Sequence, residues 1–447
     1  MGVVVIGAGA AGLVAAAFAS TPEHPAVLVE RTSDGGRKII ISGGGRCNVL
    51  PAALEPDRFI TSSPTHLLRH MLRAWPLEAQ KQFFQDELGV PLKFEADSRK
   101  YFPVSNKARD IRDGLVAFAR RRGVQFQFGT TVENITRVGD GWRVETSNGV
   151  IDARAVIIAT GGLSVPDTGS DGAGLRFAES LGHTVHDVYP ALTPLLASPA
   201  VHASLSGLSL DVRIRAKWQG KVRTSEGGFL FTHRGYSGPA VLDISDVVTR
   251  AGTKAKATGS EPFSTDIHNL GTELGPQSSV PKLWISVEKG SDPVAFALSP
   301  AVLRVQWGEL DAAAWEPLLT RGVGHVASLL GASLQQRLVD QLMLEALVPS
   351  DRRISDLRRS ERIALLEKLT SYVLPWTGDE GFKKAEVTGG GVALDEVHLK
   401  TLESRRAPGL YFCGEVLDAF GPIGGHNFAW AWATGRTAGM AAAAPRT

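Results

Sequence analysis

The sequence predicts an α/β fold, in which helices cover the faces of a parallel sheet. Three observations at the start of the chain support this prediction. The run VVVIG from Val3 is β-branched and typical of a strand buried in a parallel sheet. The spacing GxGxxG from Gly7 to Gly12 leads into an alanine-rich helical stretch from Leu13 to Ala19. A second strand, AVLVE, then ends on Glu30.

This order of strand, turn, helix and strand is the fingerprint of a dinucleotide-binding Rossmann domain. Gly7 permits the tight turn, Gly9 lets a pyrophosphate approach the backbone, and Gly12 lets the helix pack closely on the strand. Glu30 is placed to bind ribose hydroxyls, and the N–H groups that begin the helix face the phosphates. NAD and FAD both bind this fingerprint, so these residues leave the choice of dinucleotide open.

Two later segments favour FAD. ARAVIIATGG, from Ala153 to Gly162, predicts a strand that runs into a turn, and in two-dinucleotide-type flavoproteins such a turn closes over the nucleotide. APGLYFCGEVLDAFG, from Ala407 to Gly421, predicts another buried strand, and an acid after it, such as Asp418, holds the ribityl chain in those proteins. We therefore expect a discontinuous Rossmann FAD-binding domain that the C-terminus completes. The sequence has no second strand–GxGxxG–helix segment, so we expect no dedicated NAD domain.

The composition is that of an ordinary globular enzyme. Lys and Arg number 48 against 46 Asp and Glu, so no overall field favours nucleic acid or acidic partners. The two cysteines cannot form a disulfide framework, which favours a reducing compartment. The N-terminus lacks the basic segment of a signal peptide, and no apolar run is long enough to span a bilayer. We therefore expect a cytoplasmic protein that does not bind a membrane.

Further segments carry a resemblance to a known family. They are GRKIIISGGGRCN from Gly36, YFPVSNKA from Tyr101, IIATGGLSVPDTGSDGAGLRFAESLGH from Ile157, LFTHRGYSGPAVLDIS from Leu230, VTGGGV from Val387 and GLYFCGEVLDAFGPIGGHNFAWAWATGRTAG from Gly409. In this order, from one end of the chain to the other, they resemble the BaiN-like, aminoacetone-oxidase-type family of NAD(P)/FAD-dependent oxidoreductases, the YhiN-like flavoproteins. The chain departs from the family's pattern at His426, where an aromatic residue such as Tyr is more usual.

The resemblance and the local patterns together imply a domain order. Residues 1–190 form the first part of the FAD-binding domain, 191–298 an inserted β-rich, β-barrel-like substrate-side domain with a polar loop at 251–280, 299–366 a helical subdomain, 367–385 a return through the β-domain, and 386–447 the second part of the FAD-binding domain. Short strands such as LDVRIRAKW and KLWISVE support the β-rich assignment.

The glycine-rich segments are expected to lie flat against the cofactor. In SGGGRCN, the glycines allow close approach, Arg46 could pair with a phosphate or a carboxylate, and Asn48 could bond the flavin edge. A surface ion pair is the alternative for Arg46. The resemblance implies that the helix beginning near Asn427 points its N-terminus at the pyrimidine end of the flavin, where it stabilises negative charge. The same helix is expected to pack Trp430 and Trp432 in the core.

These arguments give a set of expected site residues. The cofactor-binding residues are Gly7, Gly9, Ala10, Ala11, Gly12, Glu30, Arg31, Arg37, Lys38, Ser42, Gly43, Gly45, Arg46, Asn48, Val132, Ala159, Thr160, Gly161, Gly162, Asp171, Gly389, Gly390, Gly414, Glu415, Asp418, Gly424, Gly425, His426, Asn427 and Phe428. His426 is also the first candidate for a proton donor or substrate anchor, with packing against the flavin as its alternative, and Tyr236 is a weaker catalytic candidate.

Cysteine and histidine give little further evidence. Cys47 and Cys413 lie in cofactor segments and could act as a redox dithiol, although packing as small apolar residues is the commoner role. His183 and His186 have no companion ligands at metal-binding spacing, so we expect no metal.

The function expected from the resemblance is an FAD-dependent oxidoreductase that moves two electrons, with NAD(P)H as a transient donor. The family leaves open a ribosomal RNA uridine reductase, a steroid-type ring reductase and an amine oxidase that uses O2. A flavin redox sensor without turnover is the alternative from another class. The partner is a small molecule or RNA. Basic runs such as Arg120–Arg122 are usually solvated helix faces, so they leave RNA binding open without favouring it. The oligomeric state stays open.

Overall fold

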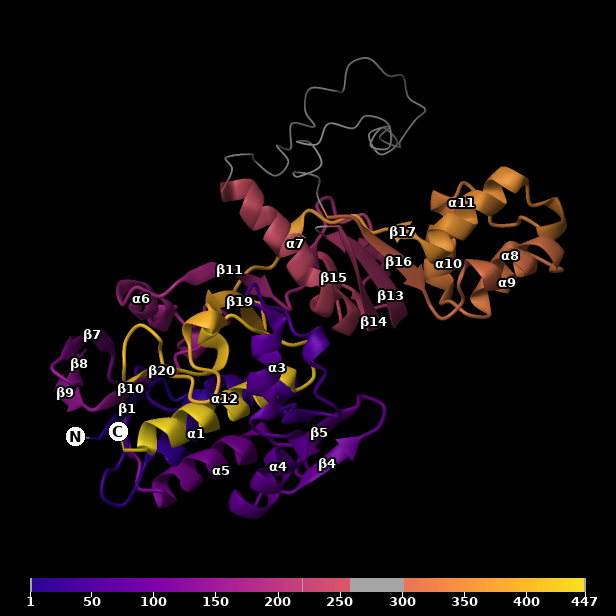
Figure 1. The fold of residues 1–447 in the computed structure, drawn as a ribbon. Coiled ribbons are helices and arrows are strands. Elements are labelled where there is room, and N and C mark those ends of the chain that lie inside the picture. The colour runs from indigo at the N-terminus through magenta and orange to yellow at the C-terminus, as the bar shows by residue number, and fades with distance from the viewer. Residues whose placement is uncertain (1, 219, 258–300, 446–447) are drawn as a thin grey trace. The chain divides into compact units, whose positions relative to one another are not determined.

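The computed structural model describes residues 2–218, 220–257 and 301–445 (Figure 1). The chain forms two compact units, one of Met1–Thr193 with Glu380–Thr447 and one of Pro194–Asp379. We call them the first and the second unit. Their boundaries lie a few residues from those expected at 190 and 386.

The first unit is built on a five-stranded parallel sheet. Its strands, in spatial order, are β20 (Leu410–Phe412), β10 (Ala155–Ile158), β1 (Val3–Ile6), β2 (Val27–Glu30) and β6 (Gln125–Phe128). All four residues of β1 and all four of β10 are buried, which explains their continuous apolar runs. The predicted strands at Val3, Glu30, Ala153 and Ala407 are confirmed.

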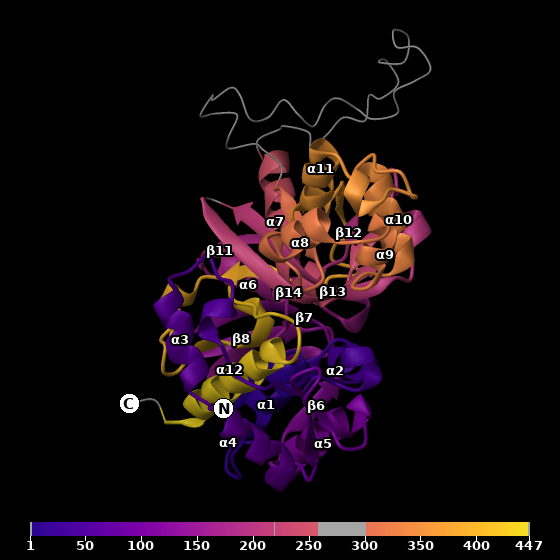
Figure 2. The ribbon, with the colours of Figure 1, turned by 90° about the vertical axis from the view of Figure 1, so that its right-hand side faces the viewer.

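The helices α1 (Ala10–Ala19) and α12 (His426–Ala443) pack on this sheet, and α5 (Ala108–Arg121) packs on α1. Figures 1 and 2 both show α1 and α12 side by side. Glycine makes this contact possible, because a Cβ at Gly435 would lie 2.5 Å from the carbonyl oxygen of Ala11, and one at Gly439 2.4 Å from that of Ala15. The predicted apolar stripe of α5 is confirmed, with Ala108 and Ile111 among its buried residues.

Smaller elements complete the first unit. The helices are α2 (Arg37–Ile41), a 3-10 turn (Ser42–Gly45), α3 (Thr65–Arg73), α4 (Leu77–Gln82) and α6 (Ala173–Ser180). Three antiparallel sheets comprise β3 (Leu50–Pro51), β5 (Lys100–Pro103) and β4 (Leu92–Glu95); β7 (Val132–Val138), β8 (Gly141–Thr146) and β9 (Gly149–Ala153); and β11 (Val185–Ala191) with β19 (Val387–Val392).

The second unit is built on a seven-stranded sheet. Its spatial order is β17 (Tyr372–Val373), β16 (Leu303–Trp307), β13 (Ser209–Trp218), β14 (Lys221–Phe231), β15 (Gly235–Ser237), β12 (Leu195–Leu196) and β18 (Gly378–Asp379). Within the described residues no pairing joins β17 to β18, so the sheet is open where a barrel-like domain was expected. β16 lies in the segment that was expected to be helical, so that expectation is wrong for these residues. Leu303, Val305 and Trp307 alternate along the strand and are buried in the core, which is the pattern of a strand.

The helices α7 (Pro239–Ala257) and α11 (Arg359–Thr370) pack on this sheet. α8 (Ala312–Arg321) and α10 (Gln336–Glu345) pack on α11, and α9 (Val326–Gly331) packs on α10. α7 contacts β13 and β14, and α11 contacts β16 and β17. The prediction of a loop from Ala251 is wrong for its first residues, because AGTKAKA is rich in helix-forming Ala and Lys and extends α7 to Ala257. The rest of that loop and the strand KLWISVE lie outside the described residues.

None of the helices in the described ranges combines the length and the apolar character that a bilayer-crossing segment requires.

Candidate cofactor site

A cavity of about 360 Å³ lies in the first unit, at the carboxyl ends of the parallel strands. Gly7 follows β1, Glu30 ends β2, Ala159 follows β10 and Gly414 follows β20. This is the edge where open α/β sheets bind their ligands. Ten of the residues that line the cavity are glycine, so backbone rather than side chains forms much of its wall.

Many of the expected cofactor residues line this cavity. They are Gly7, Gly9, Ala10, Ala11, Glu30, Arg37, Lys38, Ser42, Gly43, Asn48, Ala159, Thr160, Gly161, Gly414, Glu415, Gly424, Gly425, Asn427 and Phe428. Segments from both ends of the sequence therefore meet at one place, as the expected discontinuous domain requires.

The start of α1 presents an anion-binding surface to the cavity. Gly9 is the N-cap, no side chain caps the helix, and its first turn holds no acidic residue. The helix N-terminus therefore keeps unpaired N–H groups and its positive dipole end for a ligand. A Cβ at Gly9 would meet no protein atom within 4 Å, and its φ of −75° suits any residue. The fold does not require glycine here, whereas a ligand lying against the backbone would.

Glu30 lies in the cavity wall and is held in place by its own neighbours. Its Oε2 accepts from the N–H of Ala8 at 2.8 Å, and its Oε1 accepts from the N–H and the hydroxyl of Thr32 at 2.8 and 2.7 Å. An ionised carboxylate has room for further donors, so Glu30 can still bind the hydroxyls of a ribose.

Lys38 and Glu415 form an ion pair in the wall. Lys38 Nζ lies 2.8 Å from Glu415 Oε2 and donates to Ser164 Oγ at 2.7 Å. Glu415 Oε1 also accepts from Ser164 Oγ at 2.6 Å and from the N–H of Thr388 at 2.9 Å. Burial alone would raise the pKa of Glu415, but Lys38 and these hydrogen bonds outweigh it and hold the pKa below its ordinary value. Two of the three N–H donors of Lys38 are used, which leaves one for a ligand.

The segment Ser42–Gly45 forms a second glycine surface. Gly43 and Gly44 have φ values of 57° and 66°, a left-handed conformation in which glycine carries no strain. Gly44 has no neighbour where its Cβ would lie and, like Gly43, it lines the cavity. Asn48 closes this surface and also lines the cavity.

The N-terminus of α12 forms the remaining side. Gly425 is its N-cap, without a side-chain cap or an acidic residue in the first turn, and Gly425, Asn427 and Phe428 line the cavity. The helix begins at His426, one residue before the expected start. A ligand with negative charge near Gly425 would be stabilised by the dipole and the N–H groups of this helix.

Other expected cofactor residues do not line the cavity. They are Gly12, Arg31, Gly45, Arg46, Val132, Gly162, Asp171, Gly389, Gly390, Asp418 and His426. Gly12 serves the fold, because a Cβ there would lie 1.8 Å from the carbonyl oxygen of Gly7. Gly389 and Gly390 let β19 approach the ring of Tyr189 and the backbone of Asp187.

Arg46 and Arg31 form ion pairs within the protein. Arg46 pairs with Glu95, donates to Asn106 Oδ1 at 2.8 Å and lies 4.0 Å above the ring of Phe102. The carboxylate that Arg46 binds therefore belongs to the chain itself. Arg31 pairs with Asp171.

Asp418 was expected to hold the ribityl chain, but it does not line the cavity. Its Oδ2 accepts from Thr61 Oγ1 at 3.0 Å and from the N–H groups of Ser62 and Ser63 at 2.8 and 2.9 Å. Asp418 therefore fixes a loop of the first unit. Glu415 is the acid after β20 that reaches the cavity.

His426 also departs from expectation. Its ring is buried, packs edge-on against Phe59 with centroids 6.0 Å apart, and has Nδ1 3.3 Å from the carbonyl oxygen of Ile423. Burial lowers the pKa of His426 to about 4, so the ring is neutral at pH 7. His426 therefore packs within the protein, and this geometry supports neither proton donation nor the expected alternative of packing against the flavin.

Tyr236 lies in the core of the second unit, where its hydroxyl is 2.9 Å from Nδ1 of His202. Burial raises the pKa of Tyr236 well above its ordinary value, and no surface of the ring is open to a substrate. This geometry gives no support to a catalytic role for Tyr236.

Cys47 and Cys413 are free, fully buried thiols. Burial raises the pKa of both, that of Cys47 to about 12, so neither forms a reactive thiolate near pH 7. Packing describes both cysteines.

The remaining lining residues were not expected from the sequence. They are Ala8, Thr32, Asp34, Gly36, Ile41, Gly44, Val165, Thr168, Gly169, Ser170, Glu386, Val387, Ala419, Trp430 and Ala431. Gly44 and Gly169 belong to glycine-rich segments whose other members were recognised. Glu386 and Val387 precede the glycines of β19, and no local pattern marks them. No group of three or more His, Cys, Asp or Glu side chains suited to a metal occurs within the described part of the chain.

A parallel sheet with a GxGxxG turn and a glycine-lined cavity at its carboxyl edge defines a dinucleotide-binding α/β protein. The chain belongs to the HI0933-like Rossmann-domain family, whose model matches residues 1–441, and it is an FAD-dependent oxidoreductase. Both the expected family and the expected fold class are thereby confirmed.

Two relatives match almost the whole chain. A ribosomal RNA dihydrouridine synthase of Escherichia coli is 29% identical over 434 residues, which cover 96% of this chain and 95% of the relative. A 3-dehydro-bile acid delta(4,6)-reductase of Clostridium scindens is 28% identical over 442 residues, 98% of each chain. Among solved structures, a 3-ketosteroid delta1-dehydrogenase from Sterolibacterium denitrificans is 12% identical, with a TM-score of 0.48 and 99% of each chain covered.

The residues in the wall fit FAD. The α1 N-terminus would hold the pyrophosphate, Glu30 a ribose, and the glycine surfaces at 43–44 and 424–425 the flat ring system. The open space at Gly9 and Gly44 is the observation that supports this fit, since no part of the protein fills it.

Proposed function

We propose that this protein is a reductase that takes a hydride from NAD(P)H and delivers it to a carbon–carbon double bond conjugated to a carbonyl group. The observation that carries the proposal is the cavity wall, in which the N-termini of α1 and α12 meet two glycine surfaces. Bound FAD would supply a two-electron carrier between the donor and the substrate. The chain's own residues bind it and set its electrostatic environment.

Each part of the wall would have its own role. The N–H groups of α1 would bind the two phosphates, and Glu30 would orient a ribose through its hydroxyls. The uncapped N-terminus of α12 would stabilise negative charge at the cavity end formed by Gly425 and Asn427, which favours acceptance of a hydride. Lys38 would add a fixed positive charge, oriented by Glu415.

The donor would bind only transiently. A GxGxxG turn between a strand and a helix occurs once in the described residues, at β1 and α1, and the cavity there is assigned to FAD. NAD(P)H would therefore bind without a Rossmann domain of its own and leave before the substrate binds.

The relatives support the substrate class. One name describes a dihydrouridine product, and the other the reduction of delta(4,6) double bonds in a 3-dehydro bile acid. Both describe saturation of a ring double bond conjugated to a carbonyl group. A hydride adds to the β-carbon of such a bond and a proton to the α-carbon, so each bond that is saturated consumes one hydride and one proton.

The test offers acceptors to the reduced holoprotein without oxygen. Cyclic enones and uridine-containing RNA are mixed with it, and the return of oxidised-flavin absorbance and the saturated product are measured. We expect one saturated product per flavin with at least one of these acceptors. A reduced flavin that none of these acceptors reoxidises would contradict the proposal. If primary amines then reduce the oxidised flavin and O2 reoxidises it in a separate aerobic assay, the protein is an amine oxidase.

A further inference from the structure

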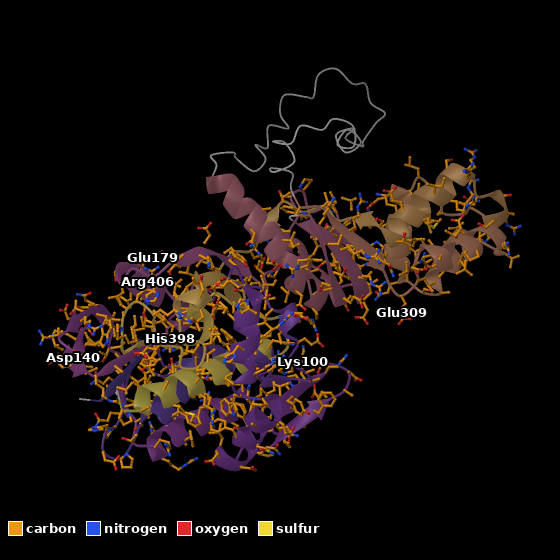
Figure 3. The ribbon with its side chains drawn as sticks, in the orientation of Figure 1. Lys100, Asp140, Glu179, Glu309, His398 and Arg406 are labelled. Carbon is orange, nitrogen blue, oxygen red and sulfur yellow. The ribbon has the colours of Figure 1, made fainter. Side chains whose placement is uncertain are left out.

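Lys100 lies beside the glycine loop that forms the rim of the cavity. A Cβ at Gly424 would lie 2.8 Å from Cε of Lys100, so the lysine side chain crosses the face of this glycine. Gly425 packs just as closely on β3, where its Cβ would lie 2.6 Å from the carbonyl carbon of Leu50. Both glycines line the cavity. Lys100, labelled in Figure 3, therefore lies against the rim with its side chain partly buried.

The backbone of Lys100 is held from two sides. It is the register partner of Pro51 on β3 and of Glu95 on β4, so β5 is the central strand of this sheet. The ammonium group has no ion pair and no hydrogen bond within the part of the chain that the structure describes.

The carboxylate of Glu95, the residue opposite Lys100 on β4, is already paired with other cations. Glu95 pairs with Arg46, and its Oε1 lies 3.4 Å from Nζ of Lys93. The hydrogen bond from Arg46 is the main reason why the pKa of Glu95 lies below its ordinary value. Arg46, Lys93 and Lys100, which we call the basic rim, thus place three positive charges around one negative charge.

Lys100 lies opposite Glu95 in the sheet, but Arg46 and Lys93 already pair with that carboxylate, so the cluster carries more positive than negative charge. The positive charge of Lys100 lies next to the loop before α12, because its side chain packs against Gly424. A phosphate group would offset this charge with several oxygens, and a lysine ammonium is a suitable partner for it.

From this arrangement we infer that Lys100, supported by Arg46 and Lys93, binds a phosphate group of the nucleotide that approaches the flavin. The inference rests on the proposed function, in which a phosphate-bearing molecule must reach this rim. The phosphate has two possible sources: the dinucleotide donor and an RNA substrate. Lys100 is an anchoring residue and takes no part in the chemistry.

The test compares the variants Lys100→Gln and Lys100→Arg with Lys400→Gln, which removes an exposed lysine elsewhere in the first unit. Binding of NADH, NADPH, adenosine 2′,5′-bisphosphate and a short uridine-containing RNA to the FAD-loaded protein is measured by calorimetry at several salt concentrations. The flavin spectrum of each variant shows whether the loop at Gly424 has kept its structure.

We expect Lys100→Gln to lower the affinity for at least one phosphate ligand about tenfold or more. The dependence of that affinity on salt concentration should also become weaker. Lys100→Arg should restore most of the affinity, and Lys400→Gln should bind as the wild type does. If affinity falls for NADPH and the bisphosphate but not for NADH, Lys100 binds the 2′-phosphate. If it falls equally for both dinucleotides, Lys100 binds the pyrophosphate. If it falls for RNA alone, Lys100 binds the substrate.

Unchanged binding of every ligand by Lys100→Gln would overturn the inference. The proposed function fails in a different way, since the wild-type flavin would then accept no electrons from NADH or NADPH. In that case the RNA and bisphosphate titrations still decide the role of Lys100.

Discussion

Two glycines of the first turn, Gly9 and Gly12, are constrained by different neighbours. A side chain at Gly12 would strike the backbone of Gly7, whereas one at Gly9 would enter the cavity. Gly12 therefore serves the packing of α1 on β1, and Gly9 serves the ligand. Sequence spacing alone cannot separate these two roles, because both glycines belong to the same motif.

The variant Gly9→Ser tests the role of Gly9. Serine is a good N-cap, so the free energy of unfolding of the apo-protein should stay within about 1 kcal/mol of wild type. Its side chain would occupy the space of the pyrophosphate, and FAD affinity should fall at least about tenfold. Gly378→Ala is the matched control, since that glycine also has open space but does not line the cavity. Equal FAD affinity in Gly9→Ser and wild type would contradict the assignment.

The Lys38–Glu415 pair allows a second test at the residue scale. Lys38→Met leaves the partly buried Glu415 carboxylate without its cation and should lower the free energy of unfolding of the apo-protein by about 1–3 kcal/mol at pH 7. The double variant Lys38→Met/Glu415→Gln should recover part of this loss. Chemical denaturation of the three proteins measures both effects.

The pH dependence of this loss has a definite sign. The folded-state pKa of Glu415 lies below its ordinary value, so the ion pair stabilises the protein above the ordinary pKa and loses its effect as the pH falls through the folded value. The difference between wild type and Lys38→Met should therefore shrink in acid. A difference that stays constant from neutral to acidic pH would show that the pair contributes nothing.

At the scale of elements, the contact between α1 and α12 joins the two ends of the chain. Gly435 and Gly439 lie one helical turn apart and meet the backbone of α1 at Ala11 and Ala15. The same two helices point their N-termini at the cavity. The packing of α12 on α1 therefore fixes the distance between the two proposed anion-binding helix ends.

Gly435→Ala tests this contact. The added methyl group would lie 2.5 Å from the Ala11 carbonyl oxygen, and the helices must separate, which should cost about 1–3 kcal/mol of unfolding free energy. FAD affinity should fall as well. Gly331→Ala on α9 is the control, because its nearest neighbour is 3.4 Å away at the end of a glutamine side chain. A Gly435→Ala protein as stable as wild type would contradict the tight contact.

In the second unit, a cluster of hydrogen-bonded polar side chains around Glu345 joins several elements. Glu345 of α10 accepts from Lys368 of α11 at 2.9 Å and from the hydroxyl of Tyr372 of β17 at 3.1 Å. His202 lies 3.2 Å from the same carboxylate and 2.9 Å from the Tyr236 hydroxyl. The cluster ties two helices to the sheet.

Acid should weaken this cluster. Burial would raise the pKa of Glu345, but hydrogen bonds from His202, Gln341 and Lys368 lower it to about 2. The carboxylate therefore stabilises the fold above its ordinary pKa, by up to about 3 kcal/mol, and this contribution is lost as the pH falls toward 2. Glu345→Gln should be less stable at pH 7 and should show a flatter acid profile in thermal melts. Parallel profiles of the two proteins would contradict this account.

At the scale of the whole molecule, the sequence predicts the first unit better than the second. The β1–α1–β2 start, the strand at Ala155 and the return of the C-terminus follow from local patterns that a parallel sheet imposes. The second unit is harder, because its sheet is antiparallel and β16 is far in sequence from its partner β13. A pairing of that kind depends on tertiary packing rather than on local propensity.

The site shows the same division. Glycines and acids that directly follow a strand were predicted, since position in the sheet decides their place. Asp418 and Arg46 were expected at the cofactor but bind Ser63 and Glu95 instead. Their side chains can reach partners in several directions, and the sequence does not determine which partner is nearest.

The central claim is that the FAD-loaded protein is reduced by NAD(P)H, and rapid mixing without oxygen tests it most directly. Holoprotein is mixed with NADPH or NADH, and the loss of oxidised-flavin absorbance is followed against time. The account predicts complete two-electron reduction by at least one donor, at a rate that saturates with donor concentration, and a smaller signal from Gly9→Ser in proportion to its lower flavin content. A flavin that stays oxidised with both donors would contradict it.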